Sequence, residues 1–328
     1  MRKIQFRGNE GFRIKGKTSI LSKENRIQYV NEKLHVSRAF MLTFLVESGG
    51  VFGSVMNYDG TVMTAGACQN ILVYPRELRK EDFQSSDDQG SLPFLLVAIE
   101  RSCPHLRPLR RLFEMFHEEG WYLSGDGKIR WRKDVEVIVG HRPLRLPAGE
   151  VVHGETLKSR IISPTGKLEP EGKQRERAVE WIQTFHEVFS DPSTFQTQVL
   201  FELSHNIALR AARYFEGKVT FEKYFYKKDI LEVRDLPPKK DLAMCFFWCN
   251  YVNAPGKAMA VIRKCRKVPH TRFSTALING LGNTSFARWD DDIENGRYRR
   301  VRRAAKKLGY WPESFFEKDG IMPMNLPG

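Results

Sequence analysis

The sequence predicts an α+β protein in which helices predominate. Apolar residues recur at helical spacing over most of the chain. An Asp-Gly turn separates two short β-forming runs after the first such stretch, and one central segment changes to an alternating pattern. With 328 residues, 41% hydrophobic and 28% charged, the chain has the composition of a folded globular protein, which excludes a collagen, a coiled coil and a wholly disordered chain.

The N-terminal part of the chain divides into an arm and a helix. Residues 1–25 are polar and rich in Lys, Arg and Gly, so we expect an irregular N-terminal arm there. From Arg26 to Leu45 apolar residues recur every three or four positions, and a Ser-Gly-Gly stop follows at 48–50. This spacing predicts a buried helix that ends at Glu47.

A hairpin and short helices are expected next. The β-forming residues 51–57 and 61–64 flank a Tyr-Asp-Gly turn, and Asp-Gly between such runs is a strong hairpin signal. Short helices are expected at 69–78, 92–99 and 106–119, which completes the first part of the core at 26–120.

Residues 121–172 alternate with a period of two and predict a β-rich insertion. Helical spacing returns at 178–189 and at 199–215, with an Asp-Pro-Ser break between the two helices. Residues 242–251 fit a helix or a buried strand equally well, and a last, basic helix is expected at 298–308. The helical remainder therefore covers 173–328.

The charge balance of the chain favours an anionic partner. The sequence has 53 Lys and Arg against 39 Asp and Glu, a formal net charge of +14. No apolar run approaches the roughly 18 residues that a membrane span requires, so no transmembrane segment is expected. No secretory signal peptide is visible, and the five cysteines favour free thiols and synthesis in the cytoplasm.

No cofactor is expected. The sequence has no glycine-rich nucleotide motif and no Gly-x-Ser-x-Gly element. The spacing of Cys245, Cys249, Cys265 and His270 could suit zinc, but the aromatic residues between the first two cysteines fit a buried core segment better. His186 is isolated on its predicted helix, where a structural role is the simpler interpretation.

Glu47 has an unusual setting for an acidic residue, at the carboxyl end of an otherwise apolar helix. Burial favours the neutral acid there, and the helix dipole disfavours the carboxylate. A protonated carboxyl near neutral pH is what general-acid attack on a glycosidic oxygen requires. The hairpin that follows could bring a second polar set opposite it, namely Asn57, Tyr58, Asp59 and Thr64.

These residues resemble the lysozyme superfamily, in which a catalytic glutamate closes a core helix and a β-hairpin and a Gly-x-x-Gln element follow. The resemblance lies within residues 34–70. Glu47-Ser48 with Ala-Gly-x-x-Gln, which ends at Gln69, looks like bacterial lytic transglycosylases. Glu, Asp and Thr across the hairpin are closer to phage-type lysozymes, although the 12-residue spacing from Glu47 to Asp59 is longer than theirs.

The resemblance implies a lysozyme-like catalytic domain with a short catalytic hairpin, which cleaves the β-1,4 bond between MurNAc and GlcNAc in peptidoglycan. Glu47 would be the general acid, and Asp59 or a water held by Thr64 would serve the oxocarbenium-like centre. The implied contacts to the glycan strand are Ser48, Asn57, Tyr58, Gln69, His205 and Asn206. Such an enzyme would act on the bacterial cell wall, in the periplasm or outside the cell, by an export route that the sequence does not identify.

Other interpretations stay open. Glu47 could act first as acid and then as base, closing the muramyl 6-hydroxyl onto C1 as lytic transglycosylases do. A glutamate before two glycines also suits a solvated helix end, Asp59 suits a turn, and Thr64 suits an ordinary strand.

The basic run at 297–307 supports a hypothesis of another class, a non-enzymatic protein that binds nucleic acid or an envelope polymer. A solvated face on a basic protein is the plainer interpretation of this run. If the chain is a peptidoglycan enzyme, nucleic acid is not the expected partner. The run would then dock the enzyme on an anionic envelope surface through Arg299, Arg300, Arg302 and Arg303.

Overall fold

The structure is a computed structural model that describes residues 1–6, 9–30, 35–57, 61–73, 89–139, 142–163, 169, 171–203 and 297–310, and also 247, 249, 258, 260 and 261. The described chain is a mixed α+β structure, about half helical, with small antiparallel sheets, which confirms the α+β class. It forms two compact units. Unit 1 comprises Met1–Asn25 and Val51–Phe201, and unit 2 comprises Arg26–Gly50 and Glu202–Gly328.

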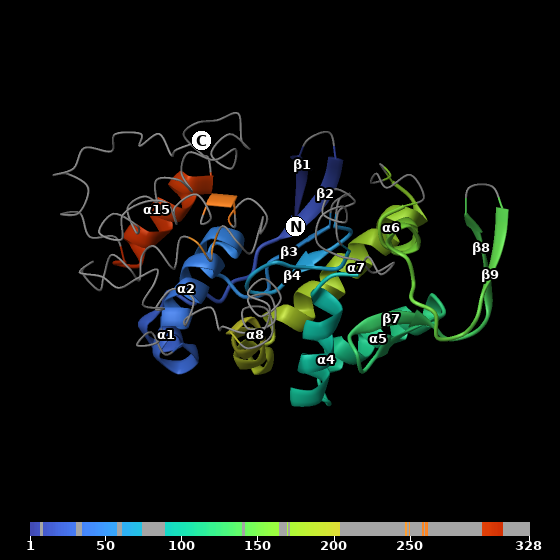
Figure 1. Ribbon diagram of the computed structural model, residues 1–328, viewed down its shortest axis with the longest axis horizontal. Helices are drawn as coiled ribbons and strands as arrows, with labels where there is room; N and C mark the ends of the chain where they lie inside the picture. Colours follow the sequence, from blue (N-terminus) through green and yellow to red (C-terminus); the bar gives the residue numbers. More distant parts are fainter. Residues whose placement is uncertain are drawn as a thin grey trace. The chain divides into compact units, whose positions relative to one another are not determined.

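Unit 1 contains a five-stranded antiparallel sheet in the order β1-β2-β3-β4-β5 (Figure 1). Its strands are β1 (Arg2–Phe6), β2 (Asn9–Ile14), β3 (Val55–Asn57), β4 (Thr64–Ala65) and β5 (Asn70–Ile71). The expected hairpin is present as β3 and β4, in which Val55 pairs with Ala65 and Met56 with Thr64.

Two expectations for this sheet are wrong. Residues 1–25 are not an irregular arm, because β1 and β2 lie within them and β2 pairs with β3. The helix expected at 69–78 is absent from its described part, where Asn70 and Ile71 pair with β4. Strand β2 pairs with β3, which is distant in sequence, so no local pattern reveals it. Strand β5 pairs with the neighbouring β4 over two residues, which is too short a run for an alternating pattern to mark it.

The expected β-rich insertion holds two hairpins, β6 (Trp121–Ser124) with β7 (Lys128–Trp131), and β8 (Val135–Val139) with β9 (Arg142–Leu146). It is not β throughout, because helix α6 (Gly154–Ile161) lies inside the expected range. Leu157 and Ile161 of α6 are buried, four residues apart on one helical face.

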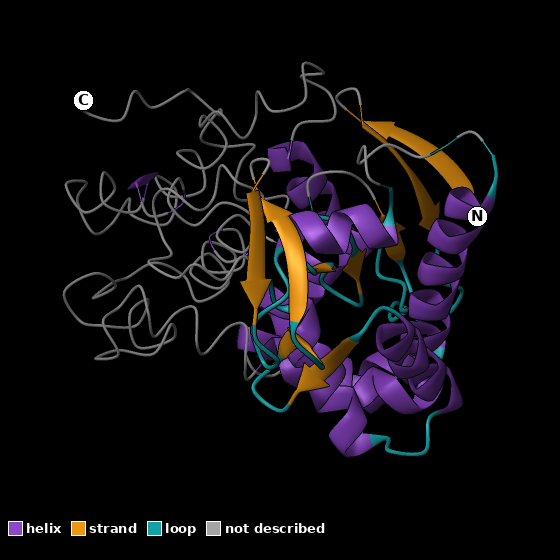
Figure 2. Ribbon diagram, turned by 90° about the vertical axis from the view of Figure 1, so that its right-hand side faces the viewer, coloured by secondary structure: helices purple, strands orange, loops and turns teal. Residues whose placement is uncertain are grey.

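The other helices of unit 1 are α4 (Leu92–Ser102), α5 (Arg107–Glu118), α7 (Lys173–Ser190), the short 3₁₀ turn η2 (Pro192–Thr194) and α8 (Phe195–Phe201), drawn in purple in Figure 2. Helices at the positions of α4, α5 and α7 were expected from the helical spacing, whereas η2 occupies the expected break and α8 begins before the helix expected at 199–215. Helix α7 contacts α5 and also strands β2, β3 and β4. It therefore connects the helical part of unit 1 to the sheet.

Large aromatic side chains form the centre of the unit 1 core. Phe116, Trp121, Trp181, Phe185 and Phe189 are fully buried. The ring centroids of Phe116 and Trp181 are 5.6 Å apart, and those of Trp121 and Trp181 are 6.4 Å apart. Burial of one such side chain contributes about 1.5–3 kcal/mol, so this cluster dominates the stability of the unit.

The described part of unit 2 centres on α2 (His35–Ser48) and α15 (Arg297–Lys307), which contact each other. Both helices were expected, and α2 ends one residue after the predicted end. The periodic run before it includes a separate helix, α1 (Lys23–Tyr29). The helix expected at 199–215 and the segment at 242–251 lie largely outside the described residues.

Candidate functional site

Glu47 is the next-to-last residue of α2, in unit 2. Its side chain is partly exposed, whereas residues 40–44 of the same helix are buried. Gly49 and Gly50 follow with φ values of 75° and 73°, which glycine adopts without a steric penalty. The N–H of Gly50 donates to the carbonyl oxygen of Phe44 over 3.2 Å. The two glycines thus end the helix and leave the Glu47 carboxyl at a partly exposed helix end.

Ser48, an expected substrate contact, is fully buried. Its Oγ donates to the carbonyl oxygen of Phe44 over 2.9 Å. Phe44 therefore accepts one hydrogen bond from the Ser48 side chain and one from the Gly50 backbone, and both close the last turn of α2. In this structure the Ser48 hydroxyl stabilises the helix end.

Two non-glycine residues of the described chain have a positive φ, Val62 at 62° and Gln69 at 56°. They flank Thr64 in unit 1. Val62 is the centre of a tight turn in which the N–H of Met63 donates to the Thr61 carbonyl over 2.6 Å. A branched residue rarely adopts this conformation, and such residues cost about 1–3 kcal/mol each and cluster at functional sites. This strained segment is the strongest candidate for a site within unit 1.

Gln69 holds Thr64 in a fixed hydrogen-bonding state. Its Nε2 donates to the carbonyl oxygens of Ser54 (3.1 Å) and Gly66 (3.2 Å), and its Oε1 lies 3.2 Å from Thr64 Oγ1. Carbonyl oxygens only accept, so the side-chain amide has one consistent orientation and the Thr64 hydroxyl must be the donor. The free lone pairs of Thr64 Oγ1 can then only accept a hydrogen bond. Thr64 is 3% exposed, and Gln69 is partly exposed.

Asn57, another expected substrate contact, is 1% exposed. Its Oδ1 accepts a hydrogen bond from the backbone N–H of Phe12 over 2.8 Å, at a paired position of β2 and β3. Its Nδ2 is buried without a hydrogen-bond partner. Asn57 therefore connects two strands at the last residue of β3.

The remaining expected site residues, Tyr58, Asp59, His205 and Asn206, lie outside the described residues. Of the expected residues, the structure brings together Thr64 and Gln69, both in unit 1, whereas Glu47 and Ser48 belong to unit 2.

The part of the chain that the structure describes contains no group of three or more His, Cys, Asp or Glu side chains that could hold a metal ion. Of the cysteines and histidine considered for zinc, Cys249 is buried, and Cys245, Cys265 and His270 lie outside the described residues. None of the described helices is long and apolar enough to cross a membrane.

The structure adds a contact that the sequence analysis missed. His186, on α7, has its Nδ1 2.6 Å from the carbonyl oxygen of Gly53. Gly53 has a φ of 77°, and a Cβ there would lie 1.9 Å from Ser190 Oγ, so only glycine fits. The next residue is Ser54, whose carbonyl anchors Gln69. The only signal in the sequence was a His and a Ser four residues apart on one helix.

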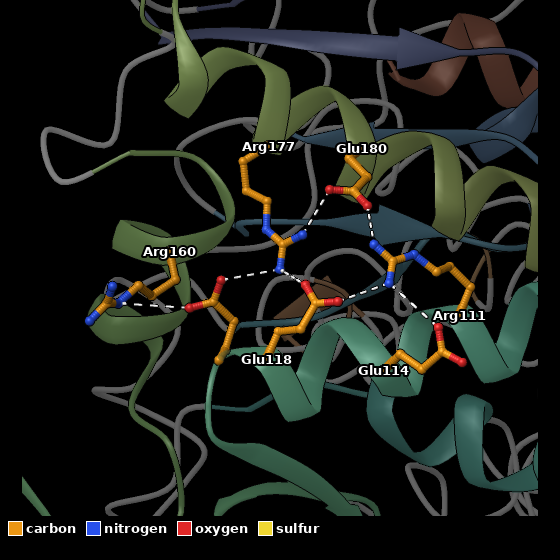
Figure 3. Close-up of polar contacts among 7 residues, drawn as sticks. Arg111, Glu114, Glu118, Arg160, Arg177 and Glu180 are labelled. Carbon is orange, nitrogen blue, oxygen red and sulfur yellow. Dashed lines mark hydrogen bonds and ion pairs between the residues drawn. The ribbon is translucent and has the colours of Figure 1, made fainter.

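A network of ion pairs joins α5 to α7 (Figure 3). Arg111 pairs with Glu118 over 2.9 Å and with Glu180, and Arg177 pairs with Glu118 over 2.8 Å and with Glu180 over 2.7 Å. The four side chains form a closed ring of alternating charge. Glu114, Glu119 and Arg160 extend it. Because charges of opposite sign face each other, this cluster stabilises the contact between α5 and α7.

Helix α15 separates apolar from basic residues. Its buried residues, together with the residue after it, are Val301, Ala304, Ala305 and Leu308. Arg300, Arg303, Lys306 and Lys307 are exposed, and Arg302 is half-buried. We call these five cations the basic face of α15.

Comparison of the chain with protein-family models, with curated proteins and with solved structures finds no match in any of the three. Function is therefore inferred from the residues described above.

Proposed function

We propose that this protein is a muramidase, a glycosidase that cleaves the β-1,4 bond between MurNAc and GlcNAc in peptidoglycan, with Glu47 as general acid. The placement of Glu47 carries the proposal: its carboxyl is partly exposed near the end of a helix whose residues 40–44 are buried, and only Ser48 separates it from the two glycines that end the helix. A general acid must come within hydrogen-bond distance of the glycosidic oxygen, which this position permits.

The state of Thr64 supports hydrolysis. Because its proton is committed to Gln69, Thr64 can accept a hydrogen bond from water. A water molecule that donates to Thr64 has a fixed orientation and keeps its lone pairs for attack. In the proposed reaction Glu47 gives its proton to the leaving oxygen, the glycosidic bond breaks, and this water adds to C1. The proton that the water loses returns to the Glu47 carboxylate or goes to Asp59.

Lytic transglycosylation by the same residues is the closest alternative. Glu47 would first protonate the leaving oxygen and then remove the proton of the muramyl 6-hydroxyl, which closes onto C1 without water. The product would be an anhydro-sugar about 18 Da lighter than the hydrolysis product, the mass of one water.

Incubation of the purified protein with isolated sacculi, followed by mass spectrometry of the soluble products, tests the proposal. We expect wild-type protein to release muropeptides, and Glu47→Gln to lose about 10² to 10⁴ of the rate because the amide cannot donate the proton. Glu187→Gln, the same change at an exposed position of α7, is the matched control. Full activity of Glu47→Gln, or no product from the wild type, would contradict the proposal.

The basic face of α15 favours a second candidate, a non-enzymatic protein that binds an anionic polymer. Such a protein would leave sacculi intact and bind nucleic acid or an envelope polymer. A filter-binding titration across salt concentrations would then give an affinity that falls steeply with salt, because each cation that pairs with the polymer releases counterions.

A further inference from the structure

The hydrogen bond between His186 and Gly53 has a definite donor. A carbonyl oxygen only accepts, so His186 Nδ1 carries the proton in this 2.6 Å contact. The neutral Nδ1–H tautomer and the doubly protonated ring both provide it. Ser190 Oγ lies 3.2 Å from the same nitrogen, one helical turn further along α7. The C-terminal half of α7 thus presents a donor to the segment that precedes β3.

Close packing fixes that segment against α7 as well. A Cβ on Gly53 would lie 1.9 Å from Ser190 Oγ and 3.0 Å from Ser190 Cα, so the Gly53 backbone lies directly on the last turn of α7. On the opposite strand of the hairpin, a Cβ on Gly66 would lie 3.5 Å from the Phe189 ring. Gly66, whose carbonyl accepts from Gln69, and Gly53, which directly precedes the other acceptor Ser54, therefore both lie against the end of α7.

Consecutive carbonyls connect α7 to the strained segment. The Gly53 carbonyl accepts from His186, and the next carbonyl, that of Ser54, accepts from Gln69. A shift of the first peptide group moves the second, because a single residue joins them. Gln69 would then lose one of the hydrogen bonds that hold its side chain and offset its left-handed backbone.

We infer that His186 is a positioning residue, which acts through Gly53 and Ser54 on the hydrogen-bonded pair of Thr64 and Gln69. Its effect on catalysis rests on the proposed function. With the anchor in place, Gln69 Oε1 accepts a hydrogen bond from the Thr64 hydroxyl, and Thr64 Oγ1 accepts one from water. Without it, Gln69 can rotate away, and the Thr64 hydroxyl is free to donate elsewhere. The expected defect is therefore one of orientation, which lowers kcat and leaves KM nearly unchanged.

The substitutions His186→Asn and His186→Gln distinguish the effect of losing the hydrogen-bond donor from the effect of a smaller side chain. Asparagine places an N–H close to where Nδ1 lies, whereas glutamine places it close to Nε2, away from Gly53. His186→Asn should therefore retain the contact and His186→Gln should lose it. His186→Leu removes the donor altogether, and Glu187→Gln is the control on the neighbouring exposed position.

The first measurement does not depend on activity. Hydrogen exchange of the Gln69 side-chain amide is followed by ¹⁵N NMR of the full chain, with the signal assigned by its absence in Gln69→Glu. We expect protection in the wild type, in His186→Asn and in Glu187→Gln, and exchange faster by about tenfold in His186→Gln and His186→Leu. Unchanged protection in the last two variants would overturn the inference, and if His186→Leu does not fold, His186→Gln decides.

The second measurement connects the contact to the reaction on sacculi. We expect His186→Gln to lower kcat by about tenfold to a hundredfold with KM within about twofold, and His186→Asn to restore most of the rate. A loss that appears in KM alone, or a defect that asparagine does not rescue, would overturn the positioning role. If the wild type cleaves no sacculi, the proposed function fails, and the exchange comparison still decides whether His186 positions Gln69.

Discussion

Thr64 is the residue at which hydrolysis and cyclisation differ. A water oriented by its hydroxyl is needed for hydrolysis and is not needed when the muramyl 6-hydroxyl is the nucleophile. If the enzyme is a hydrolase, Thr64→Ala should lower the rate of muropeptide release by about 10- to 100-fold and raise the share of anhydro products, and Thr64→Ser should keep most of the activity. Mass spectrometry of the two product classes measures this ratio. An unchanged ratio in Thr64→Ala would exclude a water held by Thr64.

Asp59 is expected to matter less than Glu47. The sequence places it in an expected Asp-Gly turn, where asparagine is equally suitable, and its spacing from Glu47 is long for a second catalytic carboxylate. We expect Asp59→Asn to lose less clearing activity than Glu47→Gln when initial rates on sacculi are compared at equal protein concentration. An equal or greater loss would indicate a mechanism with two carboxylates.

The sequence alone indicates where Glu47, Thr64 and Gln69 stand, but not how they are held. The helix stop after Glu47 and the hairpin before Gln69 are local patterns, and both are present in the structure. The contact of Gly53 with His186 joins residues 133 positions apart, and no local signal encodes it. The left-handed backbone of Gln69 is equally hidden, because tertiary contacts impose it on a residue that does not prefer it.

At the scale of elements, the Gln89 side chain forms hydrogen bonds with the backbone of β7 and of the segment beside it, as a neighbouring strand would. Its Oε1 accepts from the N–H of Ile129 over 2.7 Å, and its Nε2 donates to the carbonyls of Ile129 and Val152 over 2.8 Å each. Gln89 is 2% exposed, so its loss leaves buried polar groups unpaired. We expect Gln89→Ala to lower the free energy of unfolding by about 2–4 kcal/mol in urea titrations. Gln183→Ala, at an exposed position of α7, should change it by less than about 0.5 kcal/mol.

The basic face of α15 gives a separate prediction. Replacing Arg300, Arg302 and Arg303 with Gln, together with Arg299 of the same helix, should weaken binding to sacculi and flatten its salt dependence, because fewer counterions are released. Turnover of short soluble glycans should stay the same, since docking contributes to encounter and not to bond cleavage.

A control for the α15 variant replaces exposed cations of unit 1 instead. Arg107, Arg132 and Lys133 are exposed in unit 1, and their replacement with Gln lowers the net charge without touching α15. If both variants weaken binding to sacculi equally, overall charge and not α15 drives docking. Loss of turnover on soluble glycans in the α15 variant would indicate that the helix contributes to the substrate site.

Strong periodicity explains which elements could be predicted. Helices α5 and α7 carry buried residues at helical spacing, and both contain the core of their expected ranges. Helix α2 ends one residue after its expected end but begins at His35 and not at Arg26. The strands of residues 1–14 and the two-residue strand β5 are short and polar or lack alternation, and they form by pairing with partners in the hairpin. Helix α6 was missed because only a few apolar residues mark it.

At the scale of the whole molecule, each of the two units joins segments that are distant in sequence. The second unit takes up residues 26–50 and resumes at 202, so the chain of unit 1 is interrupted once by α2. The first boundary, between Asn25 and Arg26, coincides with the end of the polar N-terminal segment, and the division as a whole follows from contacts between distant segments. The β-rich insertion, in turn, is part of the unit 1 core, because Trp121, Ile129 and Trp131 are buried in the same cluster as Trp181.

The stability of unit 1 should depend on pH through the ion-pair ring of α5 and α7. Hydrogen bonding from Arg111 lowers the pKa of Glu118 below its ordinary value of 4.5. For Glu180, desolvation acts in the opposite direction, and hydrogen bonds from Arg111 and Arg177 outweigh it, so that its pKa is lowered too. Arg177 also lies over the Trp181 ring, 5.4 Å from its centroid, which connects the ring of charges to the aromatic core.

Carboxyl groups with a lowered pKa in the folded state stabilise it above the unfolded pKa, and this contribution is lost as the pH falls through the folded pKa. The free energy of unfolding should therefore be steady near neutral pH and fall below about pH 4.5. The side chains are partly exposed, so the ring contributes about 1–2 kcal/mol in total. Urea unfolding of Glu118→Gln/Glu180→Gln should show lower stability at pH 7 and a shallower loss between pH 5 and pH 3 than the wild type. The control Glu187→Gln, which alters an exposed carboxyl of the same helix outside the ring, should lose stability between pH 5 and pH 3 as steeply as the wild type. If Glu118→Gln/Glu180→Gln also loses stability as steeply as the wild type, other carboxylates cause the acid sensitivity.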